Sequence, residues 1–253
     1  LSQVKVESSL ESYFQADAPF VIANRAMEKM SGSRTINIVI TKTGEEEPWK
    51  NPDNLKVVEE FQEFLANEPR VKRTLSLVDL IKRISYAFNE NRKEFNRLPN
   101  GFEFLESEEI FEENGQTVKR TVKREISGRD LIAQYLVLYE NSGGDVLSDV
   151  VDSEYLNLNL AVTISSNSTT EEEKLLQSIE DYAVRQFPQG FSMTSSGMVP
   201  INVATSNEVV TSQIRSLSGS ILAVFLMLAL IFRSVPRGLM GMIPLVFTVL
   251  FNF

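Results

Sequence analysis

The sequence predicts an α+β fold, in which a ferredoxin-like split βαβ domain with a helical and hairpin insertion is followed by two transmembrane helices. Two segments, at about 36–75 and 156–196, each follow the order strand, helix, strand. Two such halves form one antiparallel sheet with helices on one face. The segment between them interrupts this order, and two long uncharged runs lie at 216–232 and 238–253. Runs of this length are typical of membrane helices.

The first half is preceded by a predicted helix over 18–31. Isoleucines then alternate with less apolar residues over 36–40, which indicates a strand with one buried face. Apolar residues at helical spacing follow from Pro52, and Pro69 ends this helix. A short strand is expected at 71–75.

An insertion is expected at about 89–150. It is introduced by a helix with a serine cap at Ser76 and an acid three residues later, Asp79. Asn114-Gly115 lies between two runs that partly alternate, which predicts a β-hairpin. Helical spacing returns over 130–140.

The second half contains the clearest strand pattern of the chain. Over 156–164 the even-numbered residues are apolar and most of the odd-numbered ones are polar. A helix with capping residues at its start is expected from Thr169 to Phe187, because Pro188 stops it. A strand follows at 191–196, and 198–210 is compatible with a helix.

Composition excludes several classes of function. The chain contains no cysteine and no histidine, which removes disulfides, thiolate chemistry, Cys/His zinc sites and imidazole acid–base catalysis. Phosphate-binding glycine loops and serine-nucleophile motifs are also absent from the sequence. Residues 1–210 carry a net charge of −12 and residues 211–253 carry +3, so nucleic acid is an unsuitable partner. We expect no enzyme activity, no cofactor and no catalytic residues.

One acidic cluster invites a metal-site interpretation. Asp145, Asp149, Asp152 and Glu154 lie within ten residues, and calcium prefers oxygen ligands. Their spacing fits no known calcium loop, so a solvated acidic loop is favoured and no metal site is assigned.

The two uncharged runs predict a membrane anchor. The run 216–232 lies between Arg215 and Arg233, and its seventeen residues span about 26 Å at ~1.5 Å per residue. We assign 211–232 as a transmembrane helix, 233–237 as a short loop and 238–253 as the start of a second, truncated transmembrane helix. Neither run contains an ionisable side chain, so neither can carry a proton relay.

Orientation follows from the loop 233–237, since arginines in short loops stay on the cytoplasmic side. Arg233 and Arg237 place this loop inside and residues 1–210 outside. The chain starts at Leu1 without the pattern of a signal peptide. We therefore expect it to be a piece of a larger polytopic protein.

Four segments together resemble the resistance–nodulation–division (RND) superfamily, nearest the branch of predicted exporters related to the mycobacterial membrane protein large (MMPL) family. They are ESYFQADAPFVIANRAMEKMSGSRTINIVI at 11–40, NPDNLKVVEEFQEFLANEPRVKRTLSLVDLIKRI at 51–84, DLIAQYLVLYENSGGD at 130–145 and SLSGSILAVFLMLALIFRSVPRGLMGMIPL at 216–245. Each motif is degenerate by itself, and their order and spacing carry the resemblance.

The resemblance implies a proton-driven inner-membrane exporter of lipids or hydrophobic compounds. Residues 1–210 would form its periplasmic porter-like domain, which handles cargo and contacts neighbouring subunits or periplasmic partners. The relay acids of such proteins lie in a later membrane helix, so none is assigned here, and the cargo-binding residues are unknown. The alternative is a membrane-tethered interaction or sensing module, similar to sterol-sensing relatives or translocation accessories.

Overall fold

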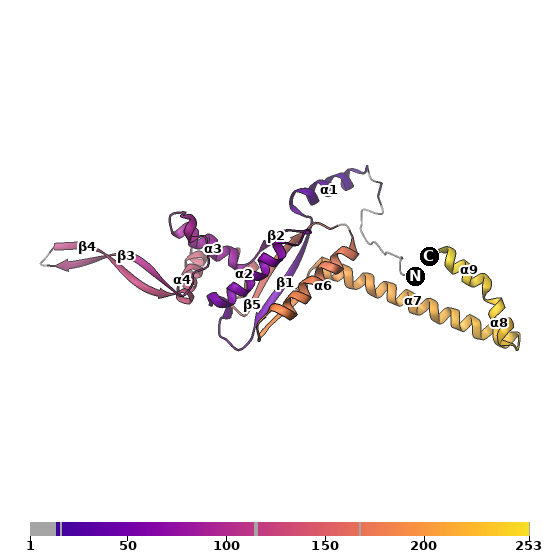
Figure 1. Cartoon of the computed structure of the whole chain (residues 1–253). Coiled ribbons are helices and arrows are strands. Elements are labelled where there is room, and N and C mark those ends of the chain that lie inside the picture. The colour runs from indigo at the N-terminus through magenta and orange to yellow at the C-terminus, as the bar shows by residue number, and fades with distance from the viewer. Residues whose placement is uncertain (1–13, 16, 114–115, 167, 253) are drawn as a thin grey trace.

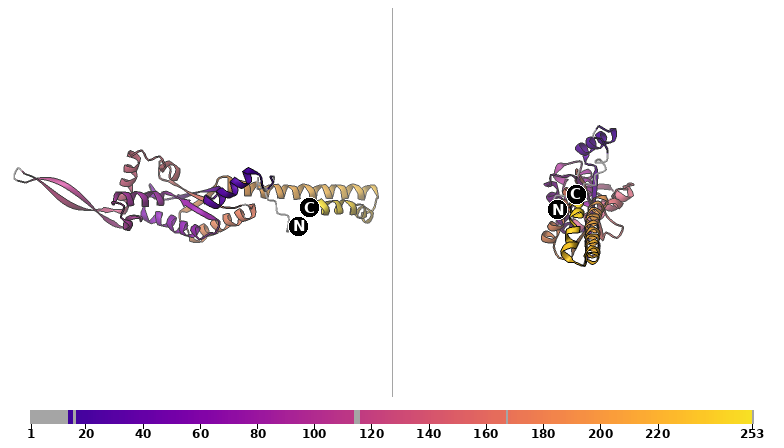
Figure 2. Two further views of the ribbon diagram at one scale, coloured as in Figure 1. Left: turned by 90° about the horizontal axis from the view of Figure 1, so that it is seen from above. Right: turned by 90° about the vertical axis from the view of Figure 1, so that its right-hand side faces the viewer.

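A body of mixed helices and strands lies between two long projections (Figure 1). The computed structural model describes residues 14–15, 17–113, 116–166 and 168–252. One projection is a β-hairpin of β3 (Phe102–Glu113) and β4 (Gln116–Ser127), and the other contains the helix α7 (Met198–Ile231). Figure 2 shows the two projections at opposite ends of an elongated molecule.

The body is built on a four-stranded sheet with the strand order β2-β5-β1-β6. Its strands are β1 (Arg34–Lys42), β2 (Val71–Leu75), β5 (Asn157–Ile164) and β6 (Phe191–Ser196). Every neighbouring pair is antiparallel. Helices and strands thus share one body, and the α+β class predicted from the sequence is confirmed.

The alternation of β5 sets which face of the sheet is buried. Leu158, Leu160, Val162 and Ile164 are fully buried, whereas the residues between them are only partly buried. The register pairs Leu160 with Ile38 and Leu158 with Ile40, so the apolar positions of β1 face the same side. The even-numbered positions, which the sequence pattern marks as apolar, therefore face the core.

Two helices pack on this apolar face, α2 (Pro52–Ala66) and α6 (Thr169–Gln186). Asn51 caps α2 by accepting a hydrogen bond from the Asp53 amide. Between the two helices, Phe61 stacks on Tyr182 with ring centroids 5.1 Å apart. Helix α1 (Pro19–Ser31) precedes the sheet and buries Val21 and Glu28.

The insertion lies between β2 and β5, and its base packs beside the body. It contains α3 (Leu77–Phe88), the hairpin, α4 (Gly128–Asn141) and α5 (Leu147–Val150). The predicted capping box is present: the Ser76 hydroxyl accepts from Val78 N at 3.1 Å and Asp79 accepts from Ser76 N at 2.8 Å. The predicted hairpin is confirmed, although its expected turn at Asn114-Gly115 lies outside the described residues.

The apolar end of the chain departs in part from expectation. Helix α7 runs without a break across residue 210, so the region expected to lead toward the membrane and the first uncharged run form one helix. The second helix begins at Val235 rather than at 238, with Pro236 in its first turn. It breaks at Met242 into α8 (Val235–Gly241) and α9 (Ile243–Asn252), because Pro244 has no amide hydrogen to continue the ladder.

Among the described residues, α7 is the one helix long and apolar enough to cross a membrane. This finding is consistent with membrane association.

Candidate functional site

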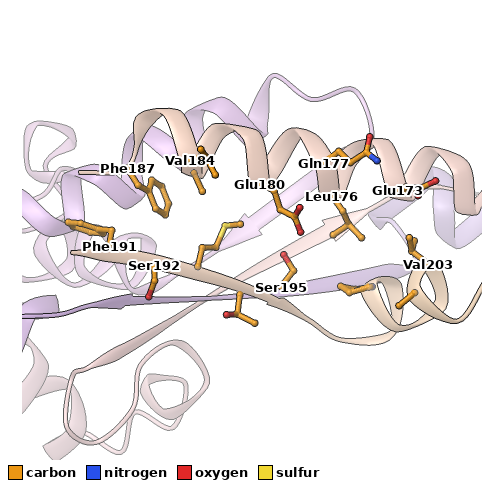
Figure 3. Close-up of a pocket in the computed structure, with 15 residues that line it drawn as sticks. Glu173, Leu176, Gln177, Glu180, Val184, Phe187, Phe191, Ser192, Ser195 and Val203 are labelled. Carbon is orange, nitrogen blue, oxygen red and sulfur yellow. The ribbon is translucent and has the colours of Figure 1, made fainter. Parts of the chain in front are cut away.

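An open groove of about 710 Å³ runs along the free edge of the sheet. Helix α6 forms one wall, β6 forms the floor, and the first turns of α7 close one end (Figure 3). Because β6 is the last strand of the order β2-β5-β1-β6, its outer edge has no strand partner among the residues that the structure describes. The volume lies within the range of ligand pockets, which is about 300–1,000 Å³.

The floor of the groove continues the inner face of the sheet, but its residues are less buried than those of the core. Residues of β6 that share the inner face with Ile38 and Ile40 of β1 are Ser195 and Met193, and both remain partly exposed. Phe191 and Phe187 form the aromatic end, with ring centroids 5.9 Å apart. The helices therefore do not fully cover the inner face of the sheet at β6, and an apolar groove remains there.

The rim of the groove is acidic and apolar. Glu173 and Glu180 lie on α6, and no basic residue is among the described residues that line the groove. Val184 projects from the same helix with 86% of its surface exposed. The Ser195 hydroxyl oxygen is buried and has no hydrogen-bond partner within the described structure. An apolar ligand with a hydrogen-bonding or cationic group matches this lining.

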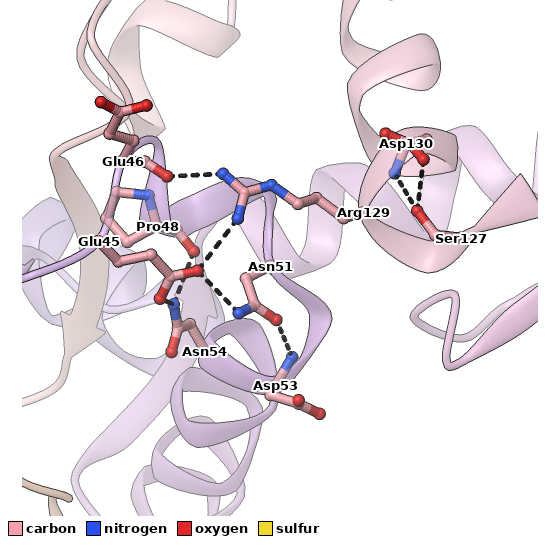
Figure 4. A network of polar contacts seen from close by, with 9 residues as sticks. All are labelled: Glu45, Glu46, Pro48, Asn51, Asp53, Asn54, Ser127, Arg129 and Asp130. Carbon is pink, nitrogen blue, oxygen red and sulfur yellow. Dashed lines mark hydrogen bonds and ion pairs between the residues drawn. The ribbon is translucent and has the colours of Figure 1, made fainter.

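A second feature is a polar clamp that joins the insertion to the body (Figure 4). The Glu45 carboxylate accepts from Asn51 Nδ2 and Asn54 Nδ2, each at 2.8 Å, and from Arg129 Nη1 at 3.2 Å. Arg129 also donates to the Glu46 carbonyl at 2.6 Å. Burial acts to raise the pKa of Glu45, but these donors outweigh it and lower the pKa below its usual range. The clamp fixes the start of α4 against the turn before α2.

A third feature is a buried ion pair beneath α1. Arg34 donates to Glu172, whose side chain is fully buried, and the second Glu172 oxygen has no partner in the described part of the chain. Glu28, also buried, accepts from the Ser33 hydroxyl at 3.2 Å. Burial raises the pKa of Glu172, Arg34 opposes this effect, and the charge of Glu28 adds to it.

In the acidic loop that was considered as a metal site, Asp152 accepts hydrogen bonds from backbone amides. Asp152 Oδ1 accepts from Leu156 N at 2.7 Å and from Asn157 N at 3.1 Å, which holds the chain at the entry to β5. Within the residues that the structure describes, no group of three or more acids could hold a metal ion. The structure does not bring Asp145, Asp149, Asp152 and Glu154 together as a ligand set.

Sequence reasoning did not find the groove, the clamp or the buried ion pair. The groove residues come from α6, β6 and α7, and each has an ordinary apolar or polar pattern by itself. Glu45 and Arg129 are 84 residues apart, and Arg34 and Glu172 are 138 apart. One signal was available for the groove, namely the half-apolar character of 191–196 beside the strongly apolar strands.

Comparison of the chain with known protein families and with curated proteins finds no match.

Proposed function

We propose that this chain is part of a proton-driven inner-membrane exporter of lipids or hydrophobic compounds, of the RND type and nearest its MMPL branch. In this proposal residues 1–210 form the periplasmic domain that handles cargo and contacts partners. The strand order supports a ferredoxin-like split βαβ fold, since β5 lies between β1 and β2 and β1 lies between β5 and β6. Each half thus contributes a strand to the interior of the other.

The observation that carries the proposal is the continuity of α7. Its first turns bury Val199 and Val203 against the body and form one end of the groove. Its last part, beyond Arg215, is apolar and exposed, as expected for a segment surrounded by lipid. A single helix of 34 residues, about 51 Å long, therefore links the groove to the proposed membrane segment without a flexible linker.

The groove supports hydrophobic cargo. Its lining is dominated by apolar side chains, and it opens to the outside along the unpaired edge of β6. A movement of α7 would shift Pro200, Val203 and Ala204, which lie in the groove wall. A displacement in the membrane would thereby reach the cargo site mechanically.

The proposal is tested first by cargo binding. Val184→Asp places a charge in the groove without disturbing the core, because Val184 is 86% exposed. The matched control is Val137→Asp on α4, where the side chain is 54% exposed and lies outside the groove. In detergent micelles, binding of a fluorescent phospholipid should weaken at least about tenfold, or ~1.4 kcal/mol, in the first variant and stay unchanged in the control.

The second test uses cells that express the entire parent protein. Export of the lipid should stop when the proton gradient is collapsed and should be reduced by Val184→Asp but not by Val137→Asp. If export is absent, or persists without a proton gradient, the exporter proposal fails. Lipid binding without export would support the tethered sensing module instead.

A further inference from the structure

The two edges of the four-stranded sheet differ in how they are protected against pairing with a further strand. At the β2 edge the register with β5 shifts between Val71 and Arg73, so Lys72 lies at a bulge. Lys72 and Arg73 are both exposed. A bulge and a lysine on an edge strand are two of the devices by which proteins prevent unwanted strand pairing. The β2 edge is therefore protected.

The β6 edge has neither device. Strand β6 has the sequence FSMTSS, which contains no charged residue and no proline. Its register with β1 continues without a shift from Lys42↔Phe191 to Asn37↔Ser196. An edge strand of this kind can accept a further strand from another polypeptide. Because the same sheet protects its other edge, the difference indicates that the β6 edge is kept open for pairing.

The hydrogen-bond pattern shows which backbone groups of β6 face outward. At the start of the β1–β6 ladder, Thr43 N donates to the Gly190 carbonyl at 2.9 Å. Hydrogen-bonded and non-hydrogen-bonded pairs alternate in an antiparallel ladder, so Ser192 and Thr194 direct their backbone groups toward β1. Met193 and Ser195 direct theirs to the outer edge, and no backbone hydrogen bond to them comes from another described element. These groups are available to a strand that lies alongside β6.

The groove lies where the side chains of such a strand would point. Met193 and Ser195 line its floor, and α6 lies over it (Figure 3). Residues of an added antiparallel strand that bond to Met193 and Ser195 would project their side chains onto this same inner face. Apolar side chains at those positions would fill the groove and cover Val184, which is 86% exposed.

The charge of the groove wall favours a basic residue among these side chains. Glu180 points from α6 toward β6 (Figure 3), and it has no ion pair within the described part of the chain. Glu173, further along α6, accepts a hydrogen bond from Asn207 Nδ2 at 2.8 Å. No lysine or arginine is among the described residues that line the groove. A basic side chain on the inward face of an added strand would therefore be attracted to Glu180.

We infer that the outer edge of β6 binds an extended segment of a separate partner polypeptide by β-strand addition, with alternate apolar side chains and one basic side chain directed into the groove. Main-chain hydrogen bonds would provide the affinity, and the groove would select the alternate side chains. This partner is a polypeptide and not a cargo molecule, so the binding goes beyond the proposed function and needs no transport. Because both would fill the same groove, a bound partner strand would exclude cargo.

The probe is a fluorophore-labelled peptide, Thr-Val-Thr-Lys-Thr-Val-Thr, acetylated and amidated at its ends. Its sequence reads the same in both directions, so the valines and the lysine share one face whichever way the strand pairs. Binding to the full chain in lipid nanodiscs is followed by fluorescence anisotropy up to millimolar concentrations. We expect saturable binding, and exchange of the lysine for glutamate should weaken it at least about tenfold, because equal charges then meet at Glu180.

Pairing through the backbone is tested by methylating amide nitrogens of the peptide. One peptide is N-methylated at both valines, and a second at the threonines on either side of the lysine. Alternate amides of a strand face opposite sides, so only one of these sets can bond to β6. We expect one methylated peptide to lose binding and the other to keep it. Equal behaviour of the two would show binding without strand addition and would overturn the inference.

The charge contact is tested with Glu180→Lys, and Glu208→Lys on α7 is the control, because Glu208 is exposed and does not line the groove. Glu180→Lys should weaken the lysine peptide at least about fivefold and strengthen the glutamate peptide, whereas Glu208→Lys should change neither. A folding defect would weaken both peptides, so the opposite shifts identify the contact. Equal effects of the two substitutions would contradict the inference.

The outcomes separate this inference from the proposed function. If the fluorescent phospholipid binds in the groove and the peptide does not, the strand-addition inference fails and the proposed cargo site remains. If the peptide binds and lipid does not, the cargo proposal fails alone. Light scattering of the chain supplies a further check: a dimer that the peptide dissociates would place a second copy on this edge and would overturn the inference of a separate partner.

Discussion

Arg34 of β1 and Glu172 of α6 form an ion pair in which the Glu172 side chain is fully buried and the Arg34 side chain is 28% exposed. The pair joins the first strand of the sheet to the helix that forms the groove wall. Only one carboxylate oxygen has a partner among the described residues. The burial of Glu172 is therefore incompletely compensated, and its pKa is raised.

This raised pKa makes stability depend on pH. The folded state binds the Glu172 proton more tightly than the unfolded state. The stabilisation that this protonation gives to the folded state is complete below about pH 4.5 and is lost as the pH rises through the raised pKa. Glu172→Gln should remove this dependence. The thermal midpoint of the variant relative to wild type should rise between pH 4.5 and 7.5. Glu171→Gln on the same helix, where the side chain is 48% exposed and forms an ion pair with Arg70, controls for the removal of one carboxylate.

The register of β5 determines the cost of polar substitutions. Leu160→Asp would bury a carboxylate between β2 and β1 beneath the helices, at a cost of roughly 3–5 kcal/mol. Thr194→Asp lies on the exposed face of β6 and should cost under about 0.5 kcal/mol. Denaturant unfolding measures both, and equal stability of the two variants would contradict the register.

Two glycines of the apolar helices differ in their surroundings. A Cβ on Gly238 would lie 2.9 Å from the Ala229 backbone, whereas a Cβ on Gly219 would meet nothing within 4 Å. Gly238→Ala should therefore force α8 away from α7 and lower the thermal midpoint in detergent, and Gly219→Ala should not. If Gly238→Ala leaves the thermal midpoint unchanged, the result contradicts the close packing of α8 against α7 at Ala229.

The proposed orientation can be checked with single cysteines. Ser142 is an exposed residue at the end of α4, and Ser234 precedes α8. In intact cells expressing the full parent protein, an impermeant maleimide should label Ser142→Cys at once and Ser234→Cys only after the membrane is opened. Labelling in the opposite order would reverse the orientation inferred from Arg233 and Arg237.

Local patterns predicted the elements of the body well. The alternation of 156–164 and the cap at Ser76 depend on neighbours within a few residues, and both are present. The start of the second apolar helix was predicted less well. The start was predicted at 238 because the last charged residue is Arg237. Helix formation depends on backbone hydrogen bonds instead, and the helix begins at Val235 and is interrupted before Pro244.

The sequence by itself determined the α+β class, the buried face of β5, the hairpin and the apolar segments, because each follows from residue type and short-range spacing. Only the tertiary structure decided the sheet order, the groove at the free edge of β6, and the contacts of Glu45 with Arg129 and of Arg34 with Glu172. These features join residues far apart in the chain. Local sequence periodicity does not predict which of the many acidic and basic residues come into contact when the helices pack.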